Sequence, residues 1–221
     1  MPTLLMRLAG PMQSWGSRSR FDERDTDLEP SKSGVIGLVC AALGRDRAER
    51  VDDLAALRMG VRVDREGLLR RDFQTAQNVR RADPTKGLQS AVTSQRYYLA
   101  DAAFLVGLEG EDGALLSVVH NALRAPHWRL GLGRKSYVPG HPVWLPDGMT
   151  NTTLEDALAG YPALHGEAPE RYRYVLDSDH GALRMDLPVA PFSERRFGAR
   201  RVHSVEFPAG EPPTTDTEGA V

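Results

Sequence analysis

TLLMRLAGPMQSWGSRSRF (residues 3–21) and PSKSGVIGLVCAALG (residues 30–44) decide the fold of this chain. The apolar residues of 3–9 stop at Gly10-Pro11, which is typical of a buried strand that ends in a turn. Ser31 or Ser33 can cap a helix whose apolar residues recur at helical spacing, and Gly44 is suited to end that helix. The stretch therefore predicts a strand, a loop and a helix.

The loop and the helix start bring together groups that bind phosphate and bases. Free N–H groups at a helix N-terminus and guanidinium donors hold phosphate oxygens, while an amide edge and an indole face suit unpaired bases. For the tryptophan the alternative is packing on the core, and for the helix start it is an ordinary cap, which is compatible with phosphate binding. The candidate RNA contacts here are Gln13, Trp15, Arg18, Arg20, Lys32 and Ser33.

The rest of residues 1–140 predicts an α+β domain. A short helix is expected over 48–57, and residues 61–76 predict a hairpin that turns near Glu66-Gly67. A strand follows with Phe104, Val106 and Leu108 on one face, then an amphipathic helix and, after a glycine-rich loop, a further strand. The helix is expected to bury Leu115, Val118, Val119 and Leu123. This order matches a ferredoxin-like domain of the RNA-recognition-motif type.

Residues 77–96 are polar, contain Pro84 and Gly87, and lack a sustained apolar face. We expect them to project from the domain, because they have little to bury in a core. Residues 62–96 carry eight cationic and four anionic side chains, which favours a nucleic-acid contact over the alternative of a solvated charged loop. The candidate contacts in the projecting segment are Arg80, Arg81, Lys86, Gln89 and Arg96.

A second candidate phosphate cradle lies in the glycine-rich loop, where glycines let a ligand approach the main chain. Its residues are Gly131, Gly133, Arg134, Lys135 and Ser136. Residues 141–207 predict a smaller β-rich portion with one short helix near 152–161, and residues 208–221 predict a disordered tail. Near the end of that portion, four arginines fit an RNA contact, a subunit contact or a basic outer strand: Arg195, Arg196, Arg200 and Arg201.

Composition limits the class of protein. With a net charge of −2, the chain does not match a free-standing nonspecific nucleic-acid binder, and a basic segment on a neutral body suits a subunit of an assembly. No apolar run approaches the length of a membrane span, so we expect no membrane contact. The single cysteine, Cys40, cannot form an internal disulfide. A soluble protein of the reducing cytoplasm is expected.

Catalytic motifs are weak. The six histidines are scattered without metal-ligand spacing, and no phosphate-binding or dinucleotide loop is present, so we predict neither a metal nor a cofactor. We predict no catalytic residues. The alternative is metal-independent RNA cleavage, which needs a base, an acid and a cation and would draw on Lys135, Tyr137 and His141. A protein-only adaptor is a third possibility, but it leaves the basic loops unexplained.

Four blocks in order, LAGPMQSWG, PSKSGVIGLVCAALG, YYLADAAFLVGL and LGRKSYVPGHP, resemble the CasD family of type I-E CRISPR surveillance complexes, within the repeat-associated mysterious protein superfamily. The resemblance covers roughly residues 4–145. It implies a ferredoxin-like domain with an inserted β-hairpin thumb, which residues 77–96 would form, and a C-terminal β-rich portion.

The same resemblance implies a function and a set of partners. A CasD subunit is expected to bind the 5′ handle of the CRISPR RNA, to cap the filament of CasC backbone subunits and to contact the large subunit CasA. Its thumb would press on the guide near the junction between handle and spacer. Target DNA would join the assembled complex, in which base pairing reads the target and protein holds the RNA backbone. Cleavage is left to a separate subunit, CasE, although a sister subtype cleaves repeat RNA on the same scaffold.

Overall fold

The computed structural model describes residues 1–17, 23–81 and 83–214. Its main element is a six-stranded antiparallel sheet in the order β10-β9-β4-β7-β1-β8. A smaller sheet is built around β6, which pairs with β2, β3 and β5. The strands of the main sheet are β1 (Thr3–Ala9), β4 (Arg58–Arg65), β7 (Ala103–Glu109), β8 (Trp144–Thr150), β9 (Arg171–Pro188) and β10 (Phe197–Pro208). Those of the smaller sheet are β2 (Met12–Gln13), β3 (Glu23–Arg24), β5 (Leu68–Arg80) and β6 (Leu88–Ala100).

Helices cover both faces of the main sheet. One face carries α1 (Lys32–Leu43), α2 (Asp52–Ala55) and α3 (Gly113–Arg124), and the other carries α4 (Leu154–Gly160). Strand alternation divides the core accordingly: Phe104, Val106 and Leu108 of β7 pack toward α1 and α3, whereas Leu105 packs toward α4. The predicted orientation of these residues is confirmed.

The predicted first strand and first helix are present. Ser31 is the N-cap of α1 with an extended backbone, and Gly44 ends the helix in the left-handed region with φ of 75°. The predicted buried face of α3 is wrong at one position, because Val118 is 56% exposed. Leu116 is fully buried in its place, since it shares the inward face with Val119 and Leu123.

The prediction of a hairpin over residues 61–76 is wrong in its pairing. The chain does turn at Glu66-Gly67, but β4 pairs with β7 and β9, while β5 pairs with β6. The turn therefore carries the chain out of the main sheet and into a separate ribbon. Residues 68–100, named the arm below, form this ribbon, with the 3-10 turn Pro84–Lys86 at its tip.

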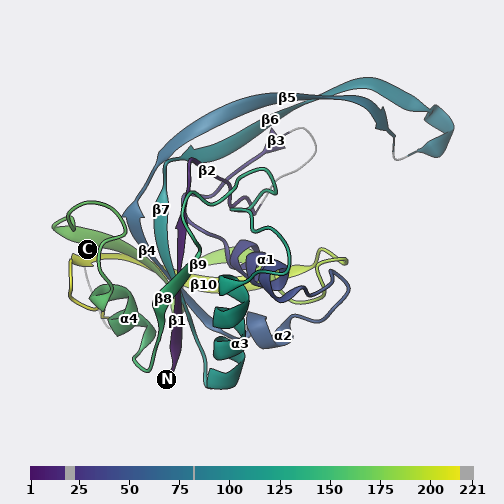
Figure 1. Cartoon of the computed structure of the whole chain (residues 1–221). Helices are drawn as coiled ribbons and strands as arrows, with labels where there is room; N and C mark the ends of the chain where they lie inside the picture. Colours follow the sequence, from purple (N-terminus) through teal and green to yellow (C-terminus); the bar gives the residue numbers. More distant parts are fainter. Residues whose placement is uncertain (18–22, 82, 215–221) are drawn as a thin grey trace.

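The arm projects from the body of the molecule, and Figure 1 shows β5 and β6 curving away from the helices and the main sheet. Residues 77–96 form its outer part, so the projection begins nearer to the body than the sequence indicated. Most side chains on both faces of the outer arm are exposed. This exposure explains why the segment shows no apolar periodicity although it is made of strands.

The C-terminal strands continue the main sheet. Within the predicted β-rich portion, residues 171–188 form the single strand β9, interrupted by a bulge at residues 178–182. β9 pairs with both β4 and β10. The predicted boundary near residue 140, between the α+β domain and the β-rich portion, therefore separates strands that belong to the same sheet. Within the expected tail, Pro208 closes β10 and Pro213 is buried, whereas residues 215–221 lie outside the described residues.

In the described part of the chain, no helix has the length and apolar character that crossing a membrane requires.

Candidate nucleic-acid interface

Two regions were predicted to bind phosphate: the loop and helix start that follow β1, and the glycine-rich loop. Contacts of the residues just after β1 bring the first region next to the glycine-rich loop at the base of the arm. The Ser14 N–H donates to the Leu132 carbonyl over 3.1 Å, and Nη2 of Arg134 donates to the Arg24 carbonyl over 3.0 Å. Strand β3 in turn pairs with β6, with Arg24 opposite Arg96. We call this meeting point the arm junction and define it as residues 14–17, 23–24, 95–97 and 131–137.

Several cationic side chains belong to the arm junction. Arg24 and Arg96 are register partners on neighbouring strands, so both side chains leave the sheet on the same face. Arg24 and Lys135 are exposed, whereas Arg96 is half-buried and its Nε donates to Ser94 Oγ over 3.1 Å. Arg134 is half-buried as well, and its Nη1 donates to the Tyr137 hydroxyl over 2.8 Å. Like charges held together in this way favour an anionic partner.

Four of the five predicted residues of the arm are exposed. Arg80, Arg81, Lys86 and Gln89 are all exposed, and Nζ of Lys86 lies 3.7 Å from Oδ2 of Asp83. The arm carries six cationic and two anionic residues. The arm and the arm junction are therefore both positively charged. Arg24 was not among the predicted contacts, because a two-residue strand gives no periodic signal.

Gln13 and Trp15 lie in the interior, which corrects the predicted RNA contacts at these positions. Trp15 is 1% exposed, and its Nε1 donates to Oε1 of Gln13 over 3.2 Å. Nε2 of Gln13 donates to the Leu8 and Ala102 carbonyls over 3.1 and 2.7 Å. The amide thus satisfies buried backbone oxygens and the indole fills the core. Arg18 and Arg20 lie outside the described residues.

Lys32 also has an internal role, which corrects the predicted phosphate site at the start of α1. Its backbone N–H donates to Oδ2 of Asp186, and its ammonium pairs with Asp177, both over 2.8 Å. Burial by itself would raise the pKa of Asp186, but Arg200 and the Lys32 N–H stabilise the carboxylate and hold that pKa below its ordinary value. A protein carboxylate therefore occupies the positive end of the helix. Ser33 beside it is half-buried.

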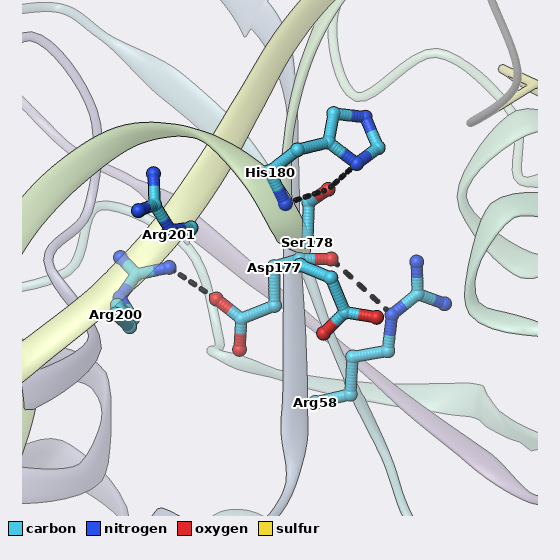
Figure 2. A pocket seen from close by; sticks show the side chains of 7 residues that line it. Arg58, Asp177, Ser178, His180, Arg200 and Arg201 are labelled. Atoms are coloured by element: carbon cyan, nitrogen blue, oxygen red, sulfur yellow. Dashed lines mark hydrogen bonds and ion pairs between the residues drawn. The ribbon is translucent and has the colours of Figure 1, made fainter.

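Two of the four C-terminal arginines, Arg200 and Arg201, line a cavity of about 750 Å³ at the bulge of β9. Figure 2 shows Arg200 directed at Asp177 and Arg58 in contact with the backbone of the same residue. Arg200 also pairs with Asp186, so carboxylates already neutralise its charge. Arg201 is exposed and donates to the Gly181 carbonyl. Because Arg58 and Arg200 are already paired with carboxylates, we expect this cavity to be a weaker phosphate site than the arm. Arg195 and Arg196 are exposed on the segment before β10.

The residues of the catalytic alternative have other contacts. Tyr137 is 4% exposed, and its hydroxyl accepts the hydrogen bond from Arg134. His141 lines a cavity of about 200 Å³ together with His165, whose pKa is lowered by burial and by the nearby Arg65. In the described part of the chain, no group of three His, Cys, Asp or Glu side chains is arranged to hold a metal ion.

Gly133 and Gly131 shape the loop of the second cradle, with the Gly133 N–H donating to the Gly131 carbonyl over 2.9 Å. Gly133 has φ of 83°, and a Cβ atom there would lie 1.6 Å from the Ser14 carbonyl oxygen. We expect Gly133→Ala to lower the free energy of unfolding by about 3 kcal/mol, because left-handed strain adds to a backbone clash. Thermal unfolding measures the loss.

The matched control for this substitution is Gly160→Ala. A Cβ at Gly160 meets no atom within 4 Å, and its φ is not in the left-handed region. An equal melting temperature for Gly133→Ala and the wild type would contradict the described contact between the two loops.

The fold and the interface define a class of protein: a mixed α/β protein, dominated by antiparallel sheet, that carries a basic projecting ribbon. Comparison with known proteins identifies the family. The model of a family described as CRISPR-associated protein (Cas_Cas5) matches residues 3–203. The Cascade subunit CasD of Escherichia coli strain K12 is 33% identical over 181 residues, which cover 74% of this chain and 79% of CasD.

Solved structures agree with this match. A chain described as "Crystal structure of Cas protein" is 54% identical with a TM-score of 0.80, and the match covers 94% of this chain and 95% of that one. A chain of a "CRISPR RNA-guided surveillance complex" is 33% identical with a TM-score of 0.75, covering 94% and 91%. The chain belongs to the Cas5 family of CRISPR-associated proteins. The resemblance to CasD stated from the sequence is confirmed.

Proposed function

We propose that the chain is a non-catalytic subunit of a type I-E CRISPR surveillance complex and that it binds the 5′ handle of the CRISPR RNA. In this proposal it caps the CasC filament, contacts the large subunit CasA, and meets target DNA in the assembled complex, in the cytoplasm. Two similar proteins, a Cascade subunit and a chain of a CRISPR RNA-guided surveillance complex, support the assignment to such a complex.

The observation that carries the RNA contact is the arrangement of cations around the base of the arm. Arg24 and Lys135 at the arm junction, and Arg80 and Arg81 farther out, are exposed. An RNA strand that follows the arm onto the body would meet positive charge along its path. Shape and backbone charge recognise such a strand, whereas unpaired bases supply selectivity.

Strand topology supports a ferredoxin-like assignment. Read as β1, α1, β4, β7, α3 and β8, the elements follow the βαββαβ order, and their strands are adjacent in the sheet as β4-β7-β1-β8. In this proposal the arm is the thumb, inserted between the second and third strands of the motif. Strands β9 and β10 then form the smaller C-terminal portion.

The non-catalytic part of the proposal is supported by the position of Tyr137. Its buried hydroxyl accepts a hydrogen bond from a guanidinium, which opposes the acceptance of a proton from a ribose hydroxyl. His141 packs near His165, with ring centroids 5.9 Å apart. The geometry thus favours RNA retention over metal-independent cleavage.

Purification of the assembled complex through a tag on this chain tests the proposal. We expect CRISPR RNA with an intact 5′ handle to co-purify, together with backbone and large subunits, and nuclease treatment to release this chain. Assembly that is unchanged after nuclease treatment would favour the protein-only adaptor. Incubation of the purified chain with labelled repeat RNA in EDTA tests the catalytic alternative. Single-turnover formation of a 2′,3′-cyclic phosphate product would overturn the non-catalytic assignment.

A further inference from the structure

An exposed aromatic ring lies on one face of the arm, apart from the cations selected from the sequence. Phe73 is 64% exposed. It lies opposite Gln95 in the antiparallel pair of β5 and β6, and Arg71 lies opposite Tyr97 in the same pair. Alternation along each strand places all four side chains on one face of the ribbon. We call Arg71, Phe73, Gln95 and Tyr97 the ring patch.

The guanidinium of the ring patch is held beside the phenyl ring. Nη1 of Arg71 donates to Oε1 of Gln95 over 3.0 Å, and Gln95 is the register partner of Phe73. Tyr97 is half-buried, so the exposed aromatic surface belongs mainly to Phe73. Arg96, which the sequence grouped with the other arm cations, lies on the opposite face with Asp72 as its partner. The two faces of the arm thus present different chemistry.

The surroundings of Phe73 indicate what covers it. The ribbon is positively charged, with six cationic and two anionic residues, so its partner is expected to be anionic. On the far side of Gln95 from Phe73, β3 places the carboxylate of Glu23. Phosphate groups are therefore expected on the Arg71 side of the ring. An anionic chain that also offers flat apolar faces is a single-stranded nucleic acid.

We propose that Phe73 stacks against one unpaired base of a single-stranded nucleic acid, with Arg71 contacting the adjacent phosphate. The inference rests on the proposed RNA-binding function and names the kind of group that the arm holds. Stacking on a phenyl ring tolerates any base, because every base has a π-face. The contact would hold an unpaired nucleotide without reading its identity.

Binding of a short fluorescein-labelled single-stranded RNA to the full chain, followed by anisotropy, tests the inference. We expect Phe73→Ala and Phe73→Leu each to weaken binding roughly tenfold, because one stacked base contributes about that factor or more. Phe73→Tyr keeps the ring and should retain wild-type affinity. Leu183→Ala is the matched control, since Leu183 is 63% exposed on β9, outside the arm.

The leucine variant separates stacking from other apolar contacts. The inference is overturned if the Phe73→Leu variant binds RNA and DNA of the same sequence as tightly as the wild type does. It is also overturned if the Phe73 variants disturb subunit assembly without changing nucleic-acid binding. Loss of affinity for either strand supports it. Crosslinking of 5-iodouridine RNA to the peptide that contains Phe73 is the direct confirmation. No binding by the wild-type chain would refute the proposed function itself, whereas tight wild-type binding without any Phe73 effect would refute the stacking alone.

Discussion

Arg62→Ala is expected to lower the free energy of unfolding by about 4 kcal/mol, because it leaves a buried carboxylate without its partner. Arg62 is fully buried. Its Nε and Nη2 bind the two carboxylate oxygens of Asp64, each over 2.9 Å. Three carbonyl oxygens accept its remaining N–H groups, and its guanidinium carbon lies 4.4 Å from the ring centre of Tyr172.

These contacts attach α4 to the main sheet. The accepting carbonyls belong to Leu158, Tyr161 and Pro162, at the end of α4 and just beyond it. Asp64 reinforces the same connection, since its Oδ2 accepts the Leu164 N–H over 2.8 Å. Loss of the arginine therefore exposes α4 to unfolding as well as leaving a charge unpaired.

Thermal unfolding measures the effect, and we expect the melting temperature to fall by roughly 10 °C in a chain of this size. Arg50→Ala is the control, because Arg50 forms an exposed ion pair with Asp52 and should leave the melting temperature unchanged. The double variant with Asp64→Ala should lose less than the sum of the single losses, since the two residues interact directly. A loss no greater than that of the control would show that Arg62 does not hold α4.

Arg80→Ala combined with Arg81→Ala is expected to weaken retention of CRISPR RNA roughly tenfold near physiological salt. Removal of each phosphate-binding side chain should also reduce the slope of log affinity against log salt by about 0.7, the value for a single strand. The two side chains are exposed near the tip of the arm, so thermal unfolding should not change. Filter binding with the complex or with the purified chain, across a series of salt concentrations, gives both quantities.

The control for this pair removes the same charge elsewhere. Arg50→Ala with Arg171→Ala lowers the net charge equally, and both residues are exposed on the body outside the arm. We expect that pair to leave the salt slope unchanged. Undiminished retention at raised salt in the Arg80 and Arg81 variant would rule out these residues as RNA contacts.

The type of a residue indicates its chemistry, but it does not show what surrounds that residue in the fold. Lys32 at a helix start is a reasonable phosphate ligand, yet Asp177 and Asp186 reach it from β9, more than a hundred residues away. Trp15 suits base stacking in a loop, but the start of α1 packs against its indole ring at Gly34. In both cases the partner comes from another element of the fold. The local sequence pattern does not show which element that will be.

Phe73 shows the converse. In the sequence it is one apolar residue within a polar segment, which gives no reason to single it out. Only the register of β5 with β6 places Arg71, Gln95 and Tyr97 on its face. A cross-strand pair depends on where the second strand begins, and the turn near residues 84–86 sets that position.

The sequence alone was sufficient to predict the first strand, and the first helix with its serine and glycine ends. It also predicted the alternation of the core strand at residues 103–109, the projecting basic segment and the family. These features depend on contacts between residues close in the chain, or on ordered motifs that need no coordinates. The three-dimensional arrangement was needed to learn that the two loop cradles meet at the base of the arm, and that the charged groups at the start of α1 face inward. Such pairings form when strands distant in sequence come together in the sheet. A buried charge is stable only beside an opposite charge, and the tertiary fold decides which residue supplies it.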